Sequence, residues 1–133
     1  MATHMQVDLV SPERRLASLE ATSIEIPAAA GDMTVMADHV PTITTLRPGV
    51  LRIHSAGSVQ EYLVTGGFAQ IGAAVSVLVE EAHAKADLTS DIVSSMLDKA
   101  QAATEAASAD AVDDARKALA DLRQSVQALG VSV

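Results

Sequence analysis

Two patterns of hydrophobic and polar residues divide the chain near residue 85. Before that point, apolar residues tend to recur at every second position in short runs separated by glycine or proline, which is typical of β-strands. After it, proline is absent, alanine dominates, and apolar residues recur at intervals of three and four, the spacing of one helix face. The sequence therefore predicts a β-rich domain over residues 1–84 and a helical region over residues 88–133.

The first region contains enough short alternating runs to form two facing sheets. In its longest run, the apolar positions change parity between Leu19 and Ile24, which predicts a β-bulge or a break near Thr22 and Ser23. The expected strands cover residues 5–10, 16–26, 33–36, 42–46, 50–54, 59–64, 68–71 and 74–79. Strands this short and this frequent predict an N-terminal antiparallel β-sandwich.

A rigid corner is predicted in the middle of this region, over residues 36–53. Pro41 keeps Val40 extended, because the proline ring disfavours the α conformation in the residue before it. Pro48 and Gly49 predict a tight turn, in which proline presets φ and glycine is free to adopt a positive φ. The corner should hold the loop before it in front of a sheet, and it displays no catalytic group.

The second region predicts an antiparallel two-helix hairpin. Thr89, Ser90 and Asp91 are candidate N-caps for the first helix, while Ser108 or Asp110 should cap the second. Gly130 is a natural stop for the second helix. The residues expected to pack the hairpin share a spacing of three and four positions: Val93, Met96, Ala100, Leu119, Leu122 and Val126. Because alanine buries little area, the hairpin should be marginal alone and should depend on docking elsewhere.

Composition limits the classes of partner. The formal net charge of −8 disfavours nucleic acid and anionic lipid as direct partners, because both attract basic proteins. The absence of cysteine excludes thiolate metal sites and fits a reducing compartment. The N-terminus lacks the pattern of a secretory signal, and no apolar run approaches the roughly 20 residues that span a bilayer. Any association with a membrane should therefore be indirect.

Candidate chemistry is sparse. The four histidines lack the spacing of a metal site, and no phosphate-binding glycine loop occurs. Glu80 and Glu81 lack a nearby nucleophile or cation motif, so a solvated strand end is expected there. His39 lies in a constrained loop, where it either contacts a partner or hydrogen-bonds the backbone. An enzyme would need an ordered nucleophile and base, and no catalytic residue, metal or cofactor is predicted.

Four segments resemble, in order, the epsilon subunit of the F-type ATP synthase, which is called delta in mitochondria. The first joins the run at residues 5–10 to Ser-Pro-Glu-Arg-Arg at 11–15. The second is Gly-Asp-Met-Thr-Val-Met at residues 31–36, and the third places His39 and Pro41 before Arg-Pro-Gly at 47–49. The fourth is Gly-Gly-Phe-Ala-Gln-Ile at residues 66–71. Each motif is weak alone, but together they cover most of residues 5–80.

The resemblance implies a non-catalytic rotor subunit of the central stalk, which links the gamma subunit to the ring of c subunits and couples proton translocation to ATP synthesis. It implies a location peripheral to the inner (plasma) membrane, on its cytoplasmic side. The residues expected to contact the c ring, from two loops at one end of the sandwich, are Ala29, Gly31, Asp32, Asp38, His39 and Pro41.

The resemblance also implies that the hairpin can contact the alpha and beta subunits and regulate ATP hydrolysis. Residues 110–129 contain three basic residues, Arg116, Lys117 and Arg123, and four aspartates, so this segment is nearly neutral. A near-neutral helix gains little binding free energy from an acidic target, since exposed ion pairs contribute at most about 1 kcal/mol each. We therefore expect weak inhibition.

An alternative is an ATP-sensing module with nucleotide held between sandwich and hairpin. Relatives that bind ATP carry an (Ile/Leu)-Asp-x-x-Arg-Ala motif at the start of the first C-terminal helix. Here Asp91 is present, but Ser94 replaces the arginine. The resemblance therefore does not favour ATP as a cofactor.

Overall fold

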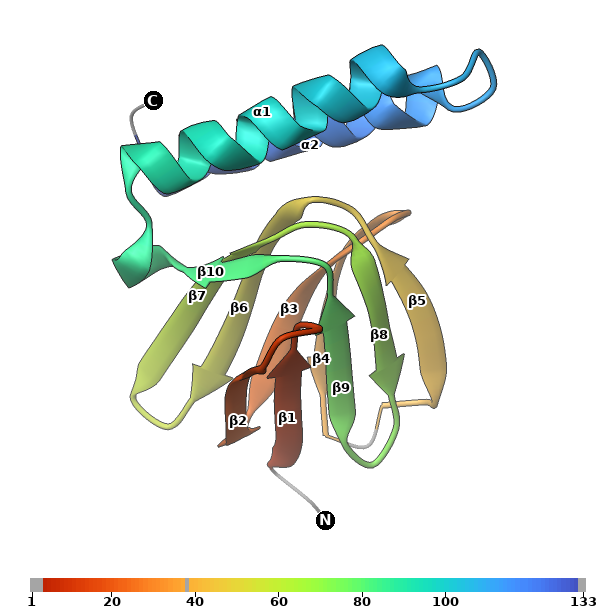
Figure 1. Cartoon of the computed structure of the whole chain (residues 1–133). Coiled ribbons are helices and arrows are strands. Elements are labelled where there is room, and N and C mark those ends of the chain that lie inside the picture. The colour runs from red at the N-terminus through yellow and green to blue at the C-terminus, as the bar shows by residue number, and fades with distance from the viewer. Residues whose placement is uncertain (1–3, 38, 132–133) are drawn as a thin grey trace.

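Ten strands are followed by two helices across residues 4–37 and 39–131, the part of the chain that the computed structural model describes (Figure 1). The strands are β1 (Met5–Val10), β2 (Arg15–Ala21), β3 (Ser23–Ala28), β4 (Gly31–Met36), β5 (Thr42–Leu46), β6 (Gly49–Ser55), β7 (Ser58–Val64), β8 (Gly67–Ile71), β9 (Val75–Val79) and β10 (Ala82–Ala84). A 3-10 turn, η1 (Lys85–Asp87), leads to helices α1 (Ser90–Ala106) and α2 (Val112–Leu129).

The strands form one continuous, strongly curled sheet whose two halves face each other as a sandwich. Its order is β10-β7-β6-β3-β5-β8-β9-β1-β2, and β4 pairs with β3 outside this path. Within the described residues the ladders are antiparallel, except that β1 runs parallel to β9, with Val7 opposite Val75. The predicted β-sandwich followed by a helical hairpin is confirmed, with this one parallel ladder as an addition.

The break expected in the longest run is confirmed at Thr22. β2 ends at Ala21 and β3 begins at Ser23, so the two halves of the run belong to different ladders. The backbone N–H and the hydroxyl of Thr22 both donate to the carbonyl oxygen of His54, at 2.8 and 3.1 Å. Thr22 is therefore fixed between β2 and β3, and the apolar side chains of both strands can reach the same core.

Aliphatic side chains fill the space between the two halves. The largest that are fully buried there include Leu9, Ile24, Ile26, Leu51 and Ile53. Tyr62 is 8% exposed and lies in this core, whereas the side chain of the single phenylalanine, Phe68, remains outside. The core is thus built from alternating Val, Ile, Leu and Ala side chains, as the strand pattern predicts.

The corner at Pro48 and Gly49 differs from the prediction. Positive φ occurs in the described residues at Gly31, Gly57, Gly67 and Gly130, and not at Gly49, which begins β6. Glycine is needed at position 49 for space, because a β carbon there would lie 2.5 Å from Cβ of Pro27. The expectation of a positive φ is wrong, and close contact between β3 and β6 is the physical reason for the glycine.

The ends of the helices agree with the prediction at two of three positions. Thr89 caps α1, its hydroxyl accepting from the N–H of Ile92 at 3.2 Å. Gly130 ends α2 with φ of 74°, in the left-handed region that favours glycine. The expectation that Ser108 or Asp110 caps α2 by its side chain is wrong. The N-cap is Ala111, and the Ser108 carbonyl accepts from the N–H groups of Ala111 and Val112, both at 3.0 Å.

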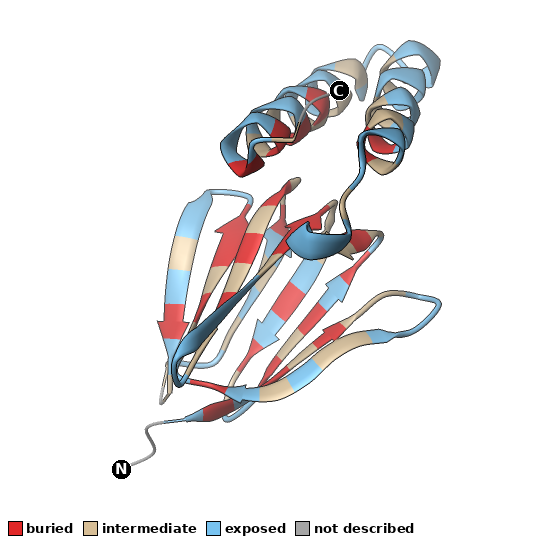
Figure 2. Cartoon of the chain, turned by 90° about the vertical axis from the view of Figure 1, so that its left-hand side faces the viewer, coloured by how far each residue is buried: buried red, intermediate tan, exposed pale blue. Residues whose placement is uncertain are grey.

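The hairpin lies across one end of the sandwich (Figures 1 and 2). The buried positions of both helices face the strands, and the exposed positions face away (Figure 2). Leu63 of β7 is fully buried in a cluster with residues of both helices. The hairpin is therefore folded down on the sandwich in this structure.

Candidate partner-binding surfaces

The β3–β4 turn and the loop before β5 are expected from the sequence to contact the same partner. In the structure they lie at opposite ends of the sandwich. They are joined by β4, which pairs with β3 from Gly31, opposite Ala28, to Met36, opposite Ser23. A strand of this length spans roughly 20 Å, at about 3.3 Å per residue. The expectation that both loops share one end is therefore wrong, because the segment between them is a full strand.

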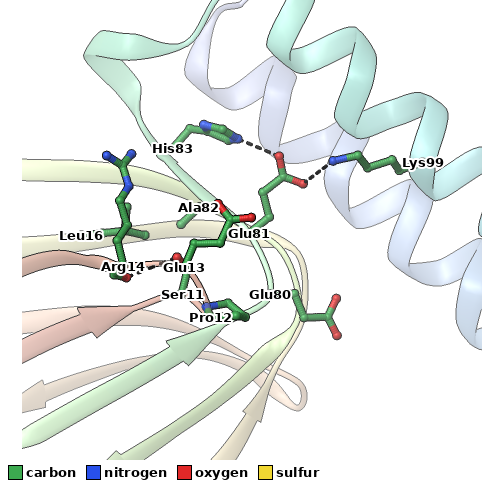
Figure 3. Close-up of a pocket in the computed structure, with 10 residues that line it drawn as sticks. All are labelled: Ser11, Pro12, Glu13, Arg14, Leu16, Glu80, Glu81, Ala82, His83 and Lys99. Carbon is green, nitrogen blue, oxygen red and sulfur yellow. Dashed lines mark hydrogen bonds and ion pairs between the residues drawn. The ribbon is translucent and has the colours of Figure 1, made fainter.

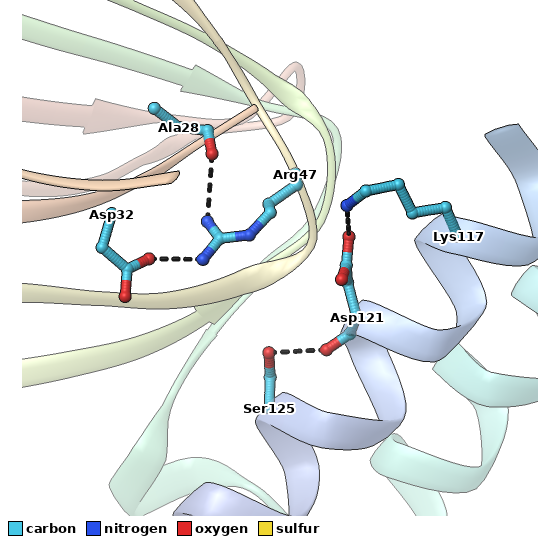
Figure 4. Close-up of polar contacts among 6 residues, drawn as sticks. All are labelled: Ala28, Asp32, Arg47, Lys117, Asp121 and Ser125. Atoms are coloured by element: carbon cyan, nitrogen blue, oxygen red, sulfur yellow. Dashed lines mark hydrogen bonds and ion pairs between the residues drawn. The ribbon is translucent and has the colours of Figure 1, made fainter. Parts of the chain in front are cut away.

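The β3–β4 turn lies at the hairpin end and is braced by Arg47. The guanidinium donates to the Ala28 carbonyl at 3.1 Å and forms an ion pair with Asp32 (Figure 4). Ala29 N–H donates to the carbonyl of Thr45 at 2.9 Å. Three predicted contact residues, Ala29, Gly31 and Asp32, are exposed on this turn. The turn is therefore held in place while its tip stays accessible.

The other loop holds His39 and Pro41 before β5. Nδ1 of His39 lies 2.7 Å from the carbonyl oxygen of Val40, which also accepts from the Thr42 hydroxyl at 2.8 Å. Of the two roles left open for His39, the structure shows the backbone hydrogen bond. Pro41 is exposed, and Asp38 lies outside the described residues.

An exposed apolar strip, formed by Ile43, Phe68 and Leu78, crosses the outer face of β5, β8 and β9. Phe68 lies directly opposite Leu78, and Ile43 is its diagonal neighbour, opposite Gln70. The side chains are 72%, 44% and 38% exposed. Sequence reasoning missed this strip. One feature of the sequence indicates the strip: Leu78 is two residues from Ser76, so this apolar side chain lies on the outward, polar face of its strand.

The outer face of the opposite half is charged. Arg52 donates to Glu61 at 3.1 Å, and Lys85 lies 3.7 Å from the other oxygen of Glu61. His54 bonds Glu25 on the same face. The two outer faces therefore differ in character, since one carries the apolar strip and the other carries paired charges.

Most of the predicted hairpin residues pack in one cluster with Leu63 of β7, and Leu119 is buried outside this cluster. Val93, Met96, Leu119, Leu122 and Val126 are buried, and Ala100 is partly buried. Sequence reasoning missed their partner on the strand side. Leu63 sits in an uninterrupted apolar run, Tyr62-Leu63-Val64, which is typical of a strand covered on both faces.

A polar cluster joins the hairpin to the strands (Figure 3). Glu81 accepts from His83 at 2.7 Å and lies 3.4 Å from Nζ of Lys99 on α1. Partial burial alone would raise the pKa of Glu81, but the His83 hydrogen bond and the Lys99 charge hold that pKa below its ordinary value. Glu80 is exposed as expected, whereas the expectation of a solvated carboxylate is wrong for Glu81.

The cluster borders a pocket of about 340 Å³ that also involves the β1–β2 turn, with Glu13, Arg14 and Glu80 in its lining. The described residues contain no group of three or more His, Cys, Asp or Glu that could hold a metal ion. Nor is any described helix long and apolar enough to cross a membrane.

Comparison with known proteins shows the family to which the chain belongs. Residues 4–85 match the model of the ATP synthase, Delta/Epsilon chain, beta-sandwich domain. The chain is 50% identical over 131 residues to the ATP synthase epsilon chain of Fuscovulum blasticum, covering 98% of this chain and 99% of the relative. It is 49% identical over 130 residues to that of Jannaschia sp. (strain CCS1), covering 97% and 98%.

A solved structure supports the fold of the whole chain. A chain in the cryo-EM structure of Euglena gracilis mitochondrial ATP synthase, OSCP/F1/c-ring, aligns with a TM-score of 0.73 and 21% identity, covering 96% of this chain and 82% of that one. The resemblance found in the motifs is confirmed. The chain belongs to the epsilon-chain family of the ATP synthase, whose members are non-catalytic subunits of that complex.

Proposed function

We propose that this chain is the rotor subunit that links the gamma subunit to the c ring, so that proton translocation is coupled to ATP synthesis. The observation that carries this proposal is the separation of the two loops by β4. A bridging subunit needs two contact surfaces that are well apart, and opposite ends of a rigid strand provide them.

The β3–β4 turn is the proposed c-ring contact. Ala29 and Gly31 have little or no side chain, so a partner loop can approach the backbone closely. Asp32 is 77% exposed at its side chain and offers a carboxylate to a basic or amide group. Arg47 holds the turn through its contacts with Ala28 and Asp32, so the turn can transmit torque to the c ring with little deformation.

The loop before β5 is the proposed gamma contact, and the apolar strip extends it along the outer face, from Ile43 near this loop to Phe68 and Leu78 next to the hairpin end of β8 and β9. Ile43, Phe68 and Leu78 present contiguous apolar area, and Val40, 74% exposed, precedes Ile43 at the loop end of β5. Permanent contacts between subunits favour such surfaces, because burial of apolar area stabilises the complex. His39 and Pro41 then flank the gamma contact, and not the c-ring contact.

The proposed location follows from the partners. The chain is held at the membrane by the c ring, on the cytoplasmic side, without lipid contact of its own. The net charge of −8 supports this arrangement, because an acidic protein is repelled by anionic lipid.

Phe68→Glu tests the proposal by co-purification with gamma. The variant places a charge in the middle of the strip and should reduce recovery of the complex by at least about tenfold, since burying an unpaired charge is costly. Thr34→Glu is the matched control, because Thr34 is an exposed strand residue on the opposite half. Equal recovery of gamma with both variants would overturn the proposed gamma contact.

A further inference from the structure

The methionines of this chain differ sharply in their exposure to solvent. Met36, the last residue of β4, is 61% exposed, whereas Met5 of β1 and Met96 of α1 are 4% and 2% exposed. Met33, earlier on β4, is partly buried and packs against the core of the sandwich. Met1 lies outside the described residues. Within the described part of the chain, Met36 is therefore the most exposed thioether.

The geometry of a strand explains the contrast between Met33 and Met36. Successive side chains of a strand point to opposite faces, so two residues that are three positions apart lie on opposite faces. Met33 shares the inner face of β4 with Val35, which is fully buried. Met36 shares the outer face with Thr34, which is exposed. The exposure of Met36 is therefore a property of the fold and not of a frayed end.

The neighbours of Met36 are polar and leave it open to water. Met36 lies opposite Ser23 of β3, and Ser23 lies opposite His54 of β6, and both of these neighbours are partly exposed. Among the described strands, β4 pairs with β3 alone, so Met36 belongs to an edge strand. An oxygen atom added to its sulfur would disturb no core contact and would remain hydrated.

We propose that Met36 is a reversible oxidation site for peroxides, which convert it to methionine sulfoxide while the sandwich stays folded and the buried methionines stay reduced. The thioether sulfur attacks one oxygen of hydrogen peroxide, so that an S–O bond forms and the O–O bond breaks. The other oxygen leaves as hydroxide and takes up the proton of the sulfur-bound hydroxyl, which gives the sulfoxide and water. Sulfur loses two electrons, and the peroxide gains them.

The exposure of Met36 also makes the reaction reversible. Methionine sulfoxide reductases return the sulfoxide to the thioether, and two thiols then form a disulfide while the oxygen leaves as water. Such an enzyme must reach the sulfoxide. The edge strand presents Met36 to it, whereas Met5 and Met96 would become accessible only on unfolding.

Peptide mapping of the full chain after treatment with dilute hydrogen peroxide tests the proposal. Fragmentation of the peptides assigns each added oxygen to one methionine, so Met1 does not interfere. Met36 should be oxidised at least about tenfold faster than Met5 and Met96, and about threefold or more faster than Met33, because oxidation follows exposure. In urea these rates should become similar. Equal rates in the folded chain, or the same contrast in urea, would overturn the proposal.

The second arm asks whether the fold tolerates the sulfoxide. Chain oxidised at Met36 should melt within about 2 °C of the untreated chain, because the added oxygen stays on the surface. Incubation with a methionine sulfoxide reductase and a dithiol should then remove the oxygen from Met36. Met36→Leu is the matched control, since it keeps the volume and lacks the sulfur, and it should lose the fast consumption of peroxide. A fall in melting temperature of more than about 5 °C on oxidation, or a sulfoxide that the reductase cannot remove, would contradict the site.

Discussion

Gly49 lies directly against Pro27, so closely that a β carbon at position 49 would come within 2.5 Å of Cβ of the proline. Arg47, two residues earlier, donates its N–H to the Pro27 carbonyl at 3.0 Å. The corner between β5 and β6 is therefore pressed onto the end of β3. This contact fixes the β3–β4 turn, which carries the proposed c-ring residues.

Gly49→Ala should lower the free energy of unfolding by about 1 to 3 kcal/mol, because the proline ring cannot move without displacing the backbone of β3. Urea unfolding followed by circular dichroism measures this change. Gly72→Ala is the control, since the nearest atom to a β carbon there is 4.0 Å away. It should change stability by less than about 0.5 kcal/mol. Equal effects of both substitutions would contradict the contact.

The elements that depend on local pattern could be predicted from the sequence. The change of parity between Leu19 and Ile24 placed the break at Thr22, and the polar residue Thr89 marked the start of α1. Both depend on residues close together in the chain.

Features that depend on distant segments could not be predicted. The end of the sandwich on which Ala29 lies is set by pairing of Ala28 with Leu46. The burial of Leu63 and the pairing of Glu81 depend on where the hairpin docks. The apolar strip could not be predicted because Ile43, Phe68 and Leu78 become neighbours only when β5, β8 and β9 are paired in register.

Glu81→Gln should reduce stability at neutral pH and have a smaller effect in acid. The pKa of Glu81 is lowered in the folded chain, so its contribution is present above its ordinary pKa and is lost as pH falls through the lower folded value. The titratable groups that face Glu81 are His83 and Lys99, with Arg14, Glu13 and Glu80 around the same pocket.

The measurement is urea unfolding at pH 6 and at pH 3 for the native chain, Glu81→Gln and Glu80→Gln. Glu81→Gln should cost at most about 1 kcal/mol at pH 6, because the ion pair is partly exposed, and less at pH 3. Glu80→Gln should have little effect at either pH, since Glu80 is exposed. A cost for Glu81→Gln that grows in acid would contradict the sign of the shift.

A fragment ending at Ala84 should fold and melt cooperatively, because the sandwich has its own core. A peptide covering residues 86–133 should be only partly helical, since the surface that buries Val93 and Leu122 includes Leu63 of the sandwich. Circular dichroism of the two pieces checks both expectations. A peptide that is fully helical and melts cooperatively would show that the hairpin does not depend on docking.

Deletion of residues 88–133 in the assembled enzyme should raise ATP hydrolysis by less than about threefold, with no change between low and high salt. The charges of α2 are nearly balanced, so an acidic target attracts it weakly. Hydrolysis assays at two salt concentrations measure this. A roughly tenfold, salt-sensitive activation would mean that charge drives inhibition.

The central claim is that opposite ends of β4 face different partners, and crosslinking in the assembled complex tests it most directly. Single cysteines at Ala29 and at Val40 are combined in turn with cysteines in the c-subunit loop and in gamma, and each disulfide is identified by mass spectrometry. The account predicts that Ala29→Cys crosslinks to c and Val40→Cys to gamma. Crosslinking of both cysteines to c, or of Ala29→Cys to gamma alone, would contradict it.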